Sequence, residues 1–320
     1  MFPEEFDYEL SEPNVLPLDM SYYTVGGKRS AQAVEVLHAD RLIRQSLGLK
    51  PRSGEMLQPW FFQKFADTKR KEYGEVVLEF PFTIADLPAG DVYLSVETPE
   101  RFSITLNGKP VGTPAEGWWI DPCYKRILLD NLQTGENVLC LKAVFTEDLN
   151  IETPYLVGQF GVSIQPTDEY CYVRPVVTRL PQTLHIGSVT TQGLPFYSGV
   201  VSYKVTGVPP SEEGQLRRVV FGGFEAACVH LRQGDKSHTV AFAPYVADVA
   251  DFDGRNPFWI DMVLTRRNTF GPLHFLPARN WAYYPDLYVV TPEQGYSDSY
   301  ALLPAGLLEK PYIENVTLKK

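Results

Sequence analysis

The sequence predicts an all-β protein made of two tandem β-sandwich domains with at most one short helix. At 320 residues the chain is long enough for two domains that each bury a core of their own. Its 24 Gly and 26 Pro divide the chain into short segments of the length that strands have. Helical periodicity is nearly absent, which argues against an α/β fold or a (β/α)₈ barrel.

One order of motifs occurs twice, and its first copy begins with a half-buried strand. Residues 101–106 alternate between polar and apolar side chains, and Asn107-Gly108 then offers the positive φ angles of a two-residue hairpin. The segment 117–122, Gly-Trp-Trp-Ile-Asp-Pro, follows, and Gly-Glu-Asn at 135–137 leads into an apolar strand at 138–145.

The second copy has the same order with looser motifs. An apolar strand at 226–231 is followed by Gln-Gly-Asp at 233–235 and by Phe-Ala-Pro-Tyr at 242–245. Gly-Arg-Asn at 254–256 then leads into an apolar strand at 258–264, and Gly254 lies 119 residues after Gly135. A period of that length indicates a duplicated domain, because solenoids repeat every 20 to 50 residues or so.

The predicted organisation has four parts. Residues 1–60 form an entry segment packed on the first sandwich, because the prolines of residues 12–19 suit an edge strand or a linker. The first sandwich covers 61–165, a linker covers 166–189, and the second sandwich with a C-terminal tail covers 190–320.

Strand patterns are clearest in the first of these domains. Residues 76–84 alternate in polarity, and Pro81 predicts that this strand lies at or near a sheet edge. Further strands are expected at 91–97, 101–106 and 137–145. The one helix candidate is 40–47, where Asp40 is placed to cap the N-terminus and Gly48 to end the helix.

Net charge and cysteine content limit the kinds of ligand and partner that we expect for this chain. The net charge of −10 disfavours nucleic acid, which needs clustered Lys and Arg. No membrane span or signal peptide is recognisable, so we expect a cytoplasmic chain with no membrane partner. The four cysteines show no Cys-x-x-Cys pair, which predicts reduced, mostly buried thiols and no zinc.

A set of motifs then resembles a known family. The segments are Glu12–Leu16, Gln58–Trp60, Ile104–Lys109, Tyr155–Gly161, Gly193–Gly199 and Asn268–His274. Together they are similar to the C-terminal β-sandwich region of large bacterial glycoside hydrolases, closest to α-L-rhamnosidase-like proteins. The resemblance runs over roughly residues 10–310 and implies jelly-roll sandwiches of the galactose-binding-like, sugar-binding type.

The resemblance also implies that catalysis does not take place in the sandwich region. In that family the catalytic carboxylates belong to a separate barrel domain, and no segment here matches it. The second sandwich departs from the pattern, because Gln233-Gly234 stands where the first has Asn107-Gly108. The implied partners are a plant or microbial oligosaccharide and a missing or separate catalytic barrel, and no cofactor is expected.

Aromatic residues in turns are the candidate ligand-binding groups, because an exposed ring stacks on the C–H face of a sugar. Trp118 and Trp119 are adjacent, so on a strand one faces inward and the other outward. The other candidates are Tyr197, His274 and Asn107, and the aromatic tail residues Trp281, Tyr283 and Tyr284 follow. The alternative is that these aromatic rings are buried where the sandwiches meet, and that His274 fixes a loop.

Candidates for catalysis or for a metal have weaker support. Asp121, Glu152 and Asp261 lie near aromatic residues, but each also suits an outward strand position or a turn. Asp251, Asp253 and Asn256 offer oxygen atoms for Ca²⁺ without a complete calcium loop, so a plain turn and no metal are favoured.

Four interpretations stay open. The first, which we favour, is a non-catalytic, carbohydrate-binding accessory region of a glycoside hydrolase that lacks the barrel. The second is a stand-alone carbohydrate-binding protein, which would need a polar cluster around an exposed aromatic residue. The third is a stand-alone hydrolase of glycosyl bonds with an unrecognised site, which a deep, acid-lined pocket would favour. The fourth is a purely structural interaction protein.

Overall fold

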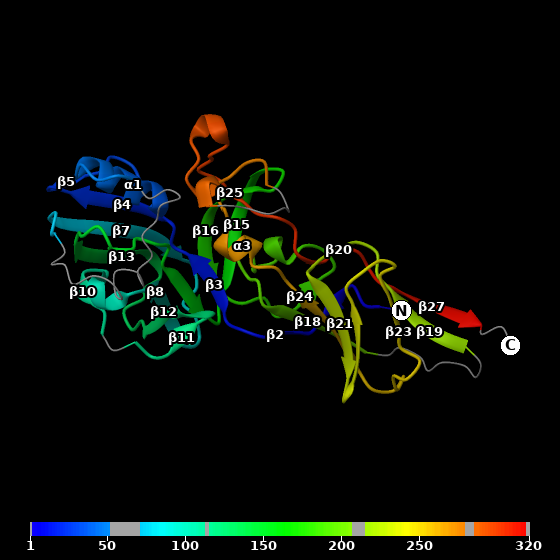
Figure 1. Ribbon diagram of the computed structural model, residues 1–320. Coiled ribbons are helices and arrows are strands. Elements are labelled where there is room, and N and C mark those ends of the chain that lie inside the picture. Colours follow the sequence, from blue (N-terminus) through cyan, green and yellow to red (C-terminus); the bar gives the residue numbers. More distant parts are fainter. Residues whose placement is uncertain (1, 52–70, 113–114, 207–214, 279–284, 318–320) are drawn as a thin grey trace.

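The protein folds almost entirely into strands. The computed structural model describes residues 2–51, 71–112, 115–206, 215–278 and 285–317. Within these ranges the strands form several sheets, and only one α-helix, α1 (Val36–Ser46), is longer than a single turn (Figure 1). The predicted all-β sandwich fold is confirmed.

The first sandwich has a large sheet facing a smaller one. The central path of the large sheet is β10 (Lys109–Pro110), β9 (Ser103–Leu106), β13 (Gly135–Val144), β7 (Glu75–Ile84), β16 (Cys171–Thr178) and β15 (Gly161–Asp168). Attached to it are β4 (Met20–Val25), β5 (Lys28–Arg29), β6 (Val34–Glu35) and β25 (Tyr300–Ala301). The facing sheet has the order β11 (Trp118–Trp119), β12 (Asp121–Leu128), β8 (Val92–Glu97), β14 (Tyr155–Gly158), β3 (Asn14–Pro17).

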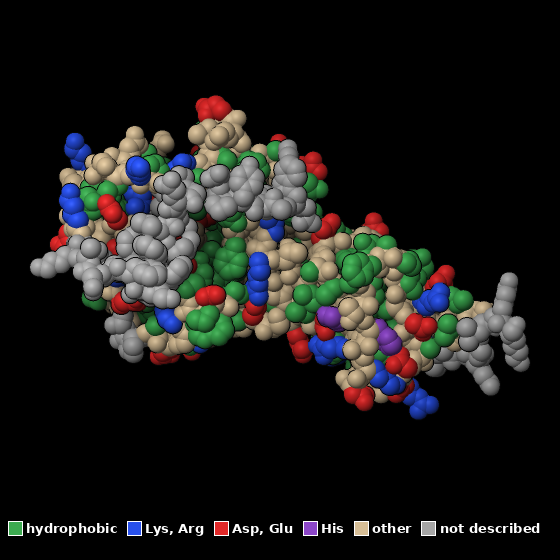
Figure 2. Space-filling view, in the orientation of Figure 1, with side chains coloured by type: hydrophobic (Ala, Val, Ile, Leu, Met, Phe, Trp, Pro, Cys, Tyr) green, Lys and Arg blue, Asp and Glu red, His purple; other side chains and the backbone are tan. Residues whose placement is uncertain are grey.

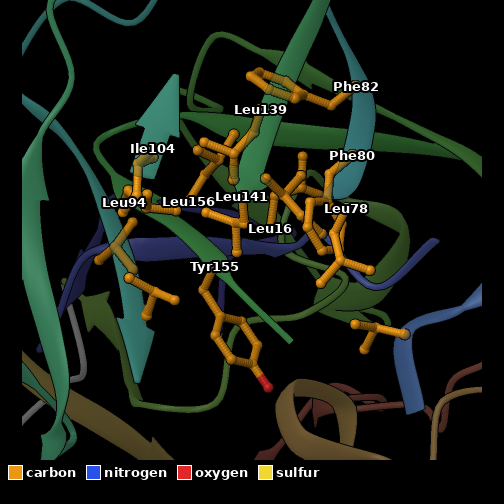
Figure 3. Packing of buried hydrophobic residues seen from close by; sticks show 14 of the residues in the cluster. Leu16, Leu78, Phe80, Phe82, Leu94, Ile104, Leu139, Leu141, Tyr155 and Leu156 are labelled. Atoms are coloured by element: carbon orange, nitrogen blue, oxygen red, sulfur yellow. The ribbon is translucent and has the colours of Figure 1, made fainter. Parts of the chain in front are cut away.

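Alternating side chains of these two sheets make the first core. Leu78 and Leu141 come from the large sheet and Leu94 and Leu156 from the facing sheet, and all four are buried (Figure 3). Tyr155 points away from this aliphatic cluster, toward the opposite surface of its own sheet (Figure 3). That surface is where the candidate site lies.

The second sandwich is smaller. Its larger sheet has the order β2 (Tyr8–Leu10), β18 (Val200–Val205), β24 (Phe258–Val263), β21 (Cys228–Gln233), β22 (Lys236–Val240), and the other has the order β23 (Val246–Asp248), β19 (Gln215–Val220), β27 (Tyr312–Thr317). Two short pairs join β1 (Glu5–Phe6) to β17 (Leu184–His185) and β20 (Phe224–Glu225) to β26 (Gly306–Leu307). The remaining helical turns are α3 (Arg267–Phe270), η1 (Pro99–Arg101), η2 (Val189–Thr191), η3 (Pro285–Tyr288) and η4 (Pro292–Gln294).

The two sandwiches share a strand order. The path β10-β9-β13-β7 of the first corresponds to β22-β21-β24-β18 of the second, and β12-β8-β14 corresponds to β23-β19-β27. Every pairing within these paths is antiparallel. The repeated order of sequence motifs therefore follows a repeated topology.

A side-chain amide holds the equivalent loop in each copy. Asn107, at a φ of 53°, donates to the Oδ1 atom of Asn137 over 2.9 Å and accepts from the Val138 amide over 2.9 Å. In the second copy Gln233 donates to the carbonyl oxygens of Asp253 and Asn256 over 2.8 and 2.9 Å. The turn amide thus binds the following Gly-x-Asn loop in both copies, although the residue type differs.

The expectation that Pro81 marks an edge strand is wrong, because β7 is paired on both sides. Opposite β13, β4 pairs with residues 76–79 of β7 and β16 with Thr83 and Ile84. Pro81, which has no N–H group, lies in the gap between these two partners. The strand is therefore central, with its proline where no backbone donor is needed.

The helix begins earlier than the sequence predicts. Its N-cap is Glu35, whose carboxylate accepts from the amides of Leu37 and His38 over 3.0 Å each. Asp40 lies inside the helix instead, with an ion pair of 2.9 Å to Arg44. Glutamate is not among the preferred N-cap residues, so residue type alone favours Asp40 over Glu35.

The ends of the predicted parts also differ from the structure. The first ten residues pair with the second sandwich through β1–β17 and β2–β18, and Phe2 and Phe6 belong to its core. Strand β3 does lie at the edge of the first sandwich. Residues 166–189, expected as a linker, carry β16 and β17, so the exact domain boundaries stay a prediction.

The cysteines and the helices give two further observations. All four cysteines are free thiols, but only Cys171 is buried and Cys123 is exposed, so the expectation of mostly buried thiols is wrong. Across the described ranges no helix has the length and apolar character to cross a membrane.

We expect Asn107→Ala to lower the free energy of unfolding by about 2 kcal/mol, because it removes the hydrogen bonds of the amide and places Ala at a positive φ that Asn adopts more readily. Urea denaturation measures this. Asn107→Gly, which relieves the backbone but also lacks the amide, should lose less. Equal stability of Asn107→Ala and the parent would contradict the role assigned to this amide.

Candidate functional site

The candidate site is a small cavity at one end of the first sandwich. It lies between Asp19, just after β3, Glu35 before α1, Tyr155 on β14, and residues of the ranges 269–274 and 287–296. Its volume is about 40 Å³, enough for about three water molecules. Ligand pockets usually measure about 300 to 1,000 Å³, so a sugar ring does not fit.

A buried ion pair forms one wall. The Nε2 atom of His274 lies 3.2 Å from Oδ2 of Asp19, and its Nδ1 atom lies 2.9 Å from the carbonyl oxygen of Ser297. Since both ring nitrogens face acceptors, both are protonated and the ring is an imidazolium. Burial alone lowers the pKa of His274, but the charge and hydrogen bond of Asp19 outweigh it and raise the pKa overall.

A tyrosine completes the bonding of this carboxylate. The hydroxyl of Tyr300, on β25, donates to Oδ1 of Asp19 over 2.7 Å. Burial and the neighbouring Asp19 charge raise the pKa of Tyr300 well above its ordinary value. Asp19 is thus held by two partners that lie more than 250 positions away in the sequence.

Glu35 is the second carboxyl group of the cavity. It is buried, and burial raises its pKa from 4.5 to about 8, although His274 and the two helix amides act in the opposite direction. At neutral pH Glu35 is therefore mostly protonated, and the charges of Asp19 and His274 balance each other.

Aromatic rings pack behind the cavity. Trp119, Tyr124, Tyr155 and Phe270 have ring centroids 5.2 to 6.4 Å apart. Phe270 comes from α3, so this helix covers the outer surface of the β12-β8-β14 sheet. The Trp119 indole N–H is buried and has no hydrogen-bond partner among the described residues. Trp119 therefore acts as a packing residue.

Trp118 lies on the other side of its strand. Its side chain is 51% exposed, whereas that of Trp119 is 5% exposed, as the strand alternation predicts. Trp118 stands opposite Lys125 of β12 in the antiparallel register. Gly117 has a φ of 73°, and a Cβ added there would lie 3.2 Å from the guanidinium of Arg126. The glycine therefore leaves room for that side chain.

The other predicted site residues are not brought together. Tyr197 is buried, and its hydroxyl donates to the carbonyl of Val200 and accepts from the amide of Ser11. Asn107 is bound into its hairpin. His274 lines the cavity and fixes a loop at the same time, while the aromatic tail residues 281–284 lie outside the described ranges. Ligand binding by any of them stays a prediction.

The weaker candidates have partners of their own. Asp121 accepts from the Cys123 amide, Asp261 pairs with Arg232 over 2.7 Å, and Asp253 accepts from the Arg255 amide. Asp251 lies 2.8 Å from His238. No group of three or more metal-ligating side chains is found in the parts of the chain that the structure describes.

Sequence reasoning missed Asp19, Glu35 and Tyr300. Asp19 follows a proline-rich edge segment and looks like a turn residue, and Glu35 lies between two apolar residues. One feature of the sequence could have pointed to Glu35. It lies between Val34 and Val36, and an acid that is buried among apolar residues needs a partner.

A wider groove is present elsewhere. It measures about 280 Å³ and lies between β15, the end of β16 and η2. Of its polar residues, Gln192 is hydrogen-bonded to the backbone of residues 185–188, and Arg179 pairs with Asp86 over 3.4 Å. None of the predicted site residues lines it.

Comparison with known proteins gives distant structural likenesses only. No family model and no curated protein matches the sequence. A β-D-glucuronidase from Dictyoglomus thermophilum is 12% identical with a TM-score of 0.27, over 79% of this chain and 38% of that chain. A rhamnosidase from Novosphingobium sp. PP1Y is 14% identical with a TM-score of 0.29, over 90% and 27%.

A putative β-galactosidase from Bacteroides fragilis is 10% identical with a TM-score of 0.23, over 81% of this chain and 36% of that chain. These solved structures are bacterial glycoside hydrolases, and the chain spans less than half of their length. A likeness at this level says nothing of what this chain binds or hydrolyses.

We expect Glu35→Gln to make the chain relatively more stable as pH rises. A raised pKa means that the folded state keeps a proton which the unfolded state loses, so the parent loses stability from about pH 4.5 to 8 and no further above. Gln accepts the same two helix amides and does not ionise. Melting curves from pH 5 to 9 should show a difference that grows up to about pH 8, and a constant difference would contradict the assignment.

Proposed function

We propose that this chain is a non-catalytic, carbohydrate-binding β-sandwich region of the α-L-rhamnosidase-like type, with Trp118 as its sugar platform. The exposed indole of Trp118 carries the proposal. Its neighbour Trp119 is buried, and the motif resemblance of the sequence agrees with the proposal.

The surroundings of Trp118 suit a sugar. A ring hydroxyl needs charged or amide partners beside the stacking surface, and Lys125 faces Trp118 across the strand pair. Arg126 is held by the Glu116 carbonyl over 3.2 Å and by the ring of Tyr93, 4.8 Å from its centroid. Lys125 is thus the charged residue that the strand register places opposite the indole.

Catalysis by this chain has less support. The resemblance implies that catalysis belongs to a barrel domain, which we propose as the partner of this chain. The one observation in favour of a hydrolase is that Asp19 and Glu35, a buried acid with a raised pKa, line one cavity. Against it, the cavity volume admits water and not a glycoside.

We expect no release of nitrophenol above the blank from aryl rhamnosides, galactosides or glucosides. The physical reason is the volume of the Glu35 cavity, which excludes these substrates. Assays of the parent beside Glu35→Gln check this. Turnover in the parent that Glu35→Gln abolishes would instead establish the stand-alone hydrolase.

We expect weak sugar binding, roughly millimolar to high micromolar, that Trp118→Ala reduces by about tenfold without changing the melting temperature. A shallow platform leaves much of the sugar in water, so few contacts exceed the cost of immobilising it. Titration with rhamnose-containing oligosaccharides measures the affinity.

Trp119→Ala is the matched control, because it removes a buried ring and should lower the melting temperature by several degrees. If the parent shows no saturable binding and both variants lose stability, the chain is a structural interaction protein.

A further inference from the structure

The duplicated topology places a second exposed aromatic turn at the position of Trp118. In the first sandwich the turn lies between β10 and β12, and it contains β11 with Trp118. In the second, residues 241–245 lie between β22 and β23, the strands that correspond to β10 and β12. Phe242 and Tyr245 are the aromatic residues of this turn.

Each turn pairs an exposed ring with an anchored one. Phe242 is 85% exposed, and Tyr245, 41% exposed, packs edge-on against Phe224 with ring centroids 4.9 Å apart. In the first sandwich Trp118 is the exposed ring and Trp119 is the anchored one. The turn is also tied down, because the Phe221 amide donates to the Tyr245 carbonyl over 2.9 Å. Hydrophobic side chains gather on this sandwich near β20, the strand that carries Phe224 (Figure 2).

We propose that the turn 241–245 is a second sugar platform, on which Phe242 stacks against a residue of a neutral polysaccharide. This inference extends the proposed function to the second sandwich. The sequence of the turn, Ala-Phe-Ala-Pro-Tyr, carries no charge, so it offers nothing to an acidic sugar. The partly exposed phenol of Tyr245 provides a hydroxyl beside the ring for the hydroxyls of the sugar.

The expected ligand is a chain of sugars and not a single one. A lone ring gives weak affinity, and the two platforms lie on different sandwiches, so a long polysaccharide that reaches both gains from multivalency while a monosaccharide does not. The small area of the turn also disfavours a protein partner, since stable protein interfaces bury about 1,200 Å² or more.

Affinity gel electrophoresis with hydroxyethyl cellulose and soluble galactan tests the proposal. Phe242→Ala should weaken retention of the full chain about tenfold, and Phe242→Trp should keep it. Tyr312→Ala is the matched control, because Tyr312 is a 57% exposed aromatic on β27 outside the turn, and it should leave retention unchanged. Melting curves of each variant show that the fold is kept.

The outcomes separate this site from that of Trp118. Retention lost in Trp118→Ala but unchanged in Phe242→Ala would overturn the second platform and leave the proposed function standing. Retention lost in Phe242→Ala but not in Trp118→Ala would support the second platform and overturn Trp118. A parent chain that neither polysaccharide retains, or equal losses in Phe242→Ala and Tyr312→Ala, would overturn the second platform.

Discussion

The buried carboxylate of Asp19 is the interaction on which the end of the first sandwich depends. It accepts from the Tyr300 hydroxyl and pairs with the His274 imidazolium, while its backbone carbonyl accepts from the Val36 amide at the start of α1 over 2.7 Å. One residue therefore joins the edge strand, the helix and the long segment that follows α3. Removing one member of a buried pair leaves an uncompensated charge. The loss of one partner therefore destabilises the packing of all three elements.

The sequence predicts much of this fold, and its failures have a common cause. Polarity alternation locates β7, β8, β9 and β13, and the Asn107-Gly108 turn falls where expected. Local patterns cannot show that Pro81 lies between two different partner strands, or that Asp19 meets His274 across 255 positions. Of the residues that line the cavity, the sequence singles out His274, whose residue type is rare, and misses the carboxyl groups, whose residue types are common.

The two sandwiches share a topology but differ in what covers their corresponding sheets. In the first, α3 brings Phe270 onto the outer surface of a sheet and encloses Trp119, which leaves only Trp118 in solvent. The second copy has a three-stranded sheet at the corresponding place, and Tyr312 lies largely exposed on its edge strand. Coverage of this sheet by α3 thus distinguishes the two copies more than strand order does.

The pairing of the first ten residues with the second sandwich has a consequence for the order of folding. The Ser11 amide binds the Tyr197 hydroxyl, 186 positions away, and every strand of the first sandwich except β25 lies inside that loop. Closing such a loop in an unstructured chain costs entropy and makes folding slow. If the first sandwich condenses earlier, the ends of its chain already lie near each other and the effective loop becomes short. During synthesis, the N-terminal strands must then stay unpaired and aggregation-prone until β18 leaves the ribosome.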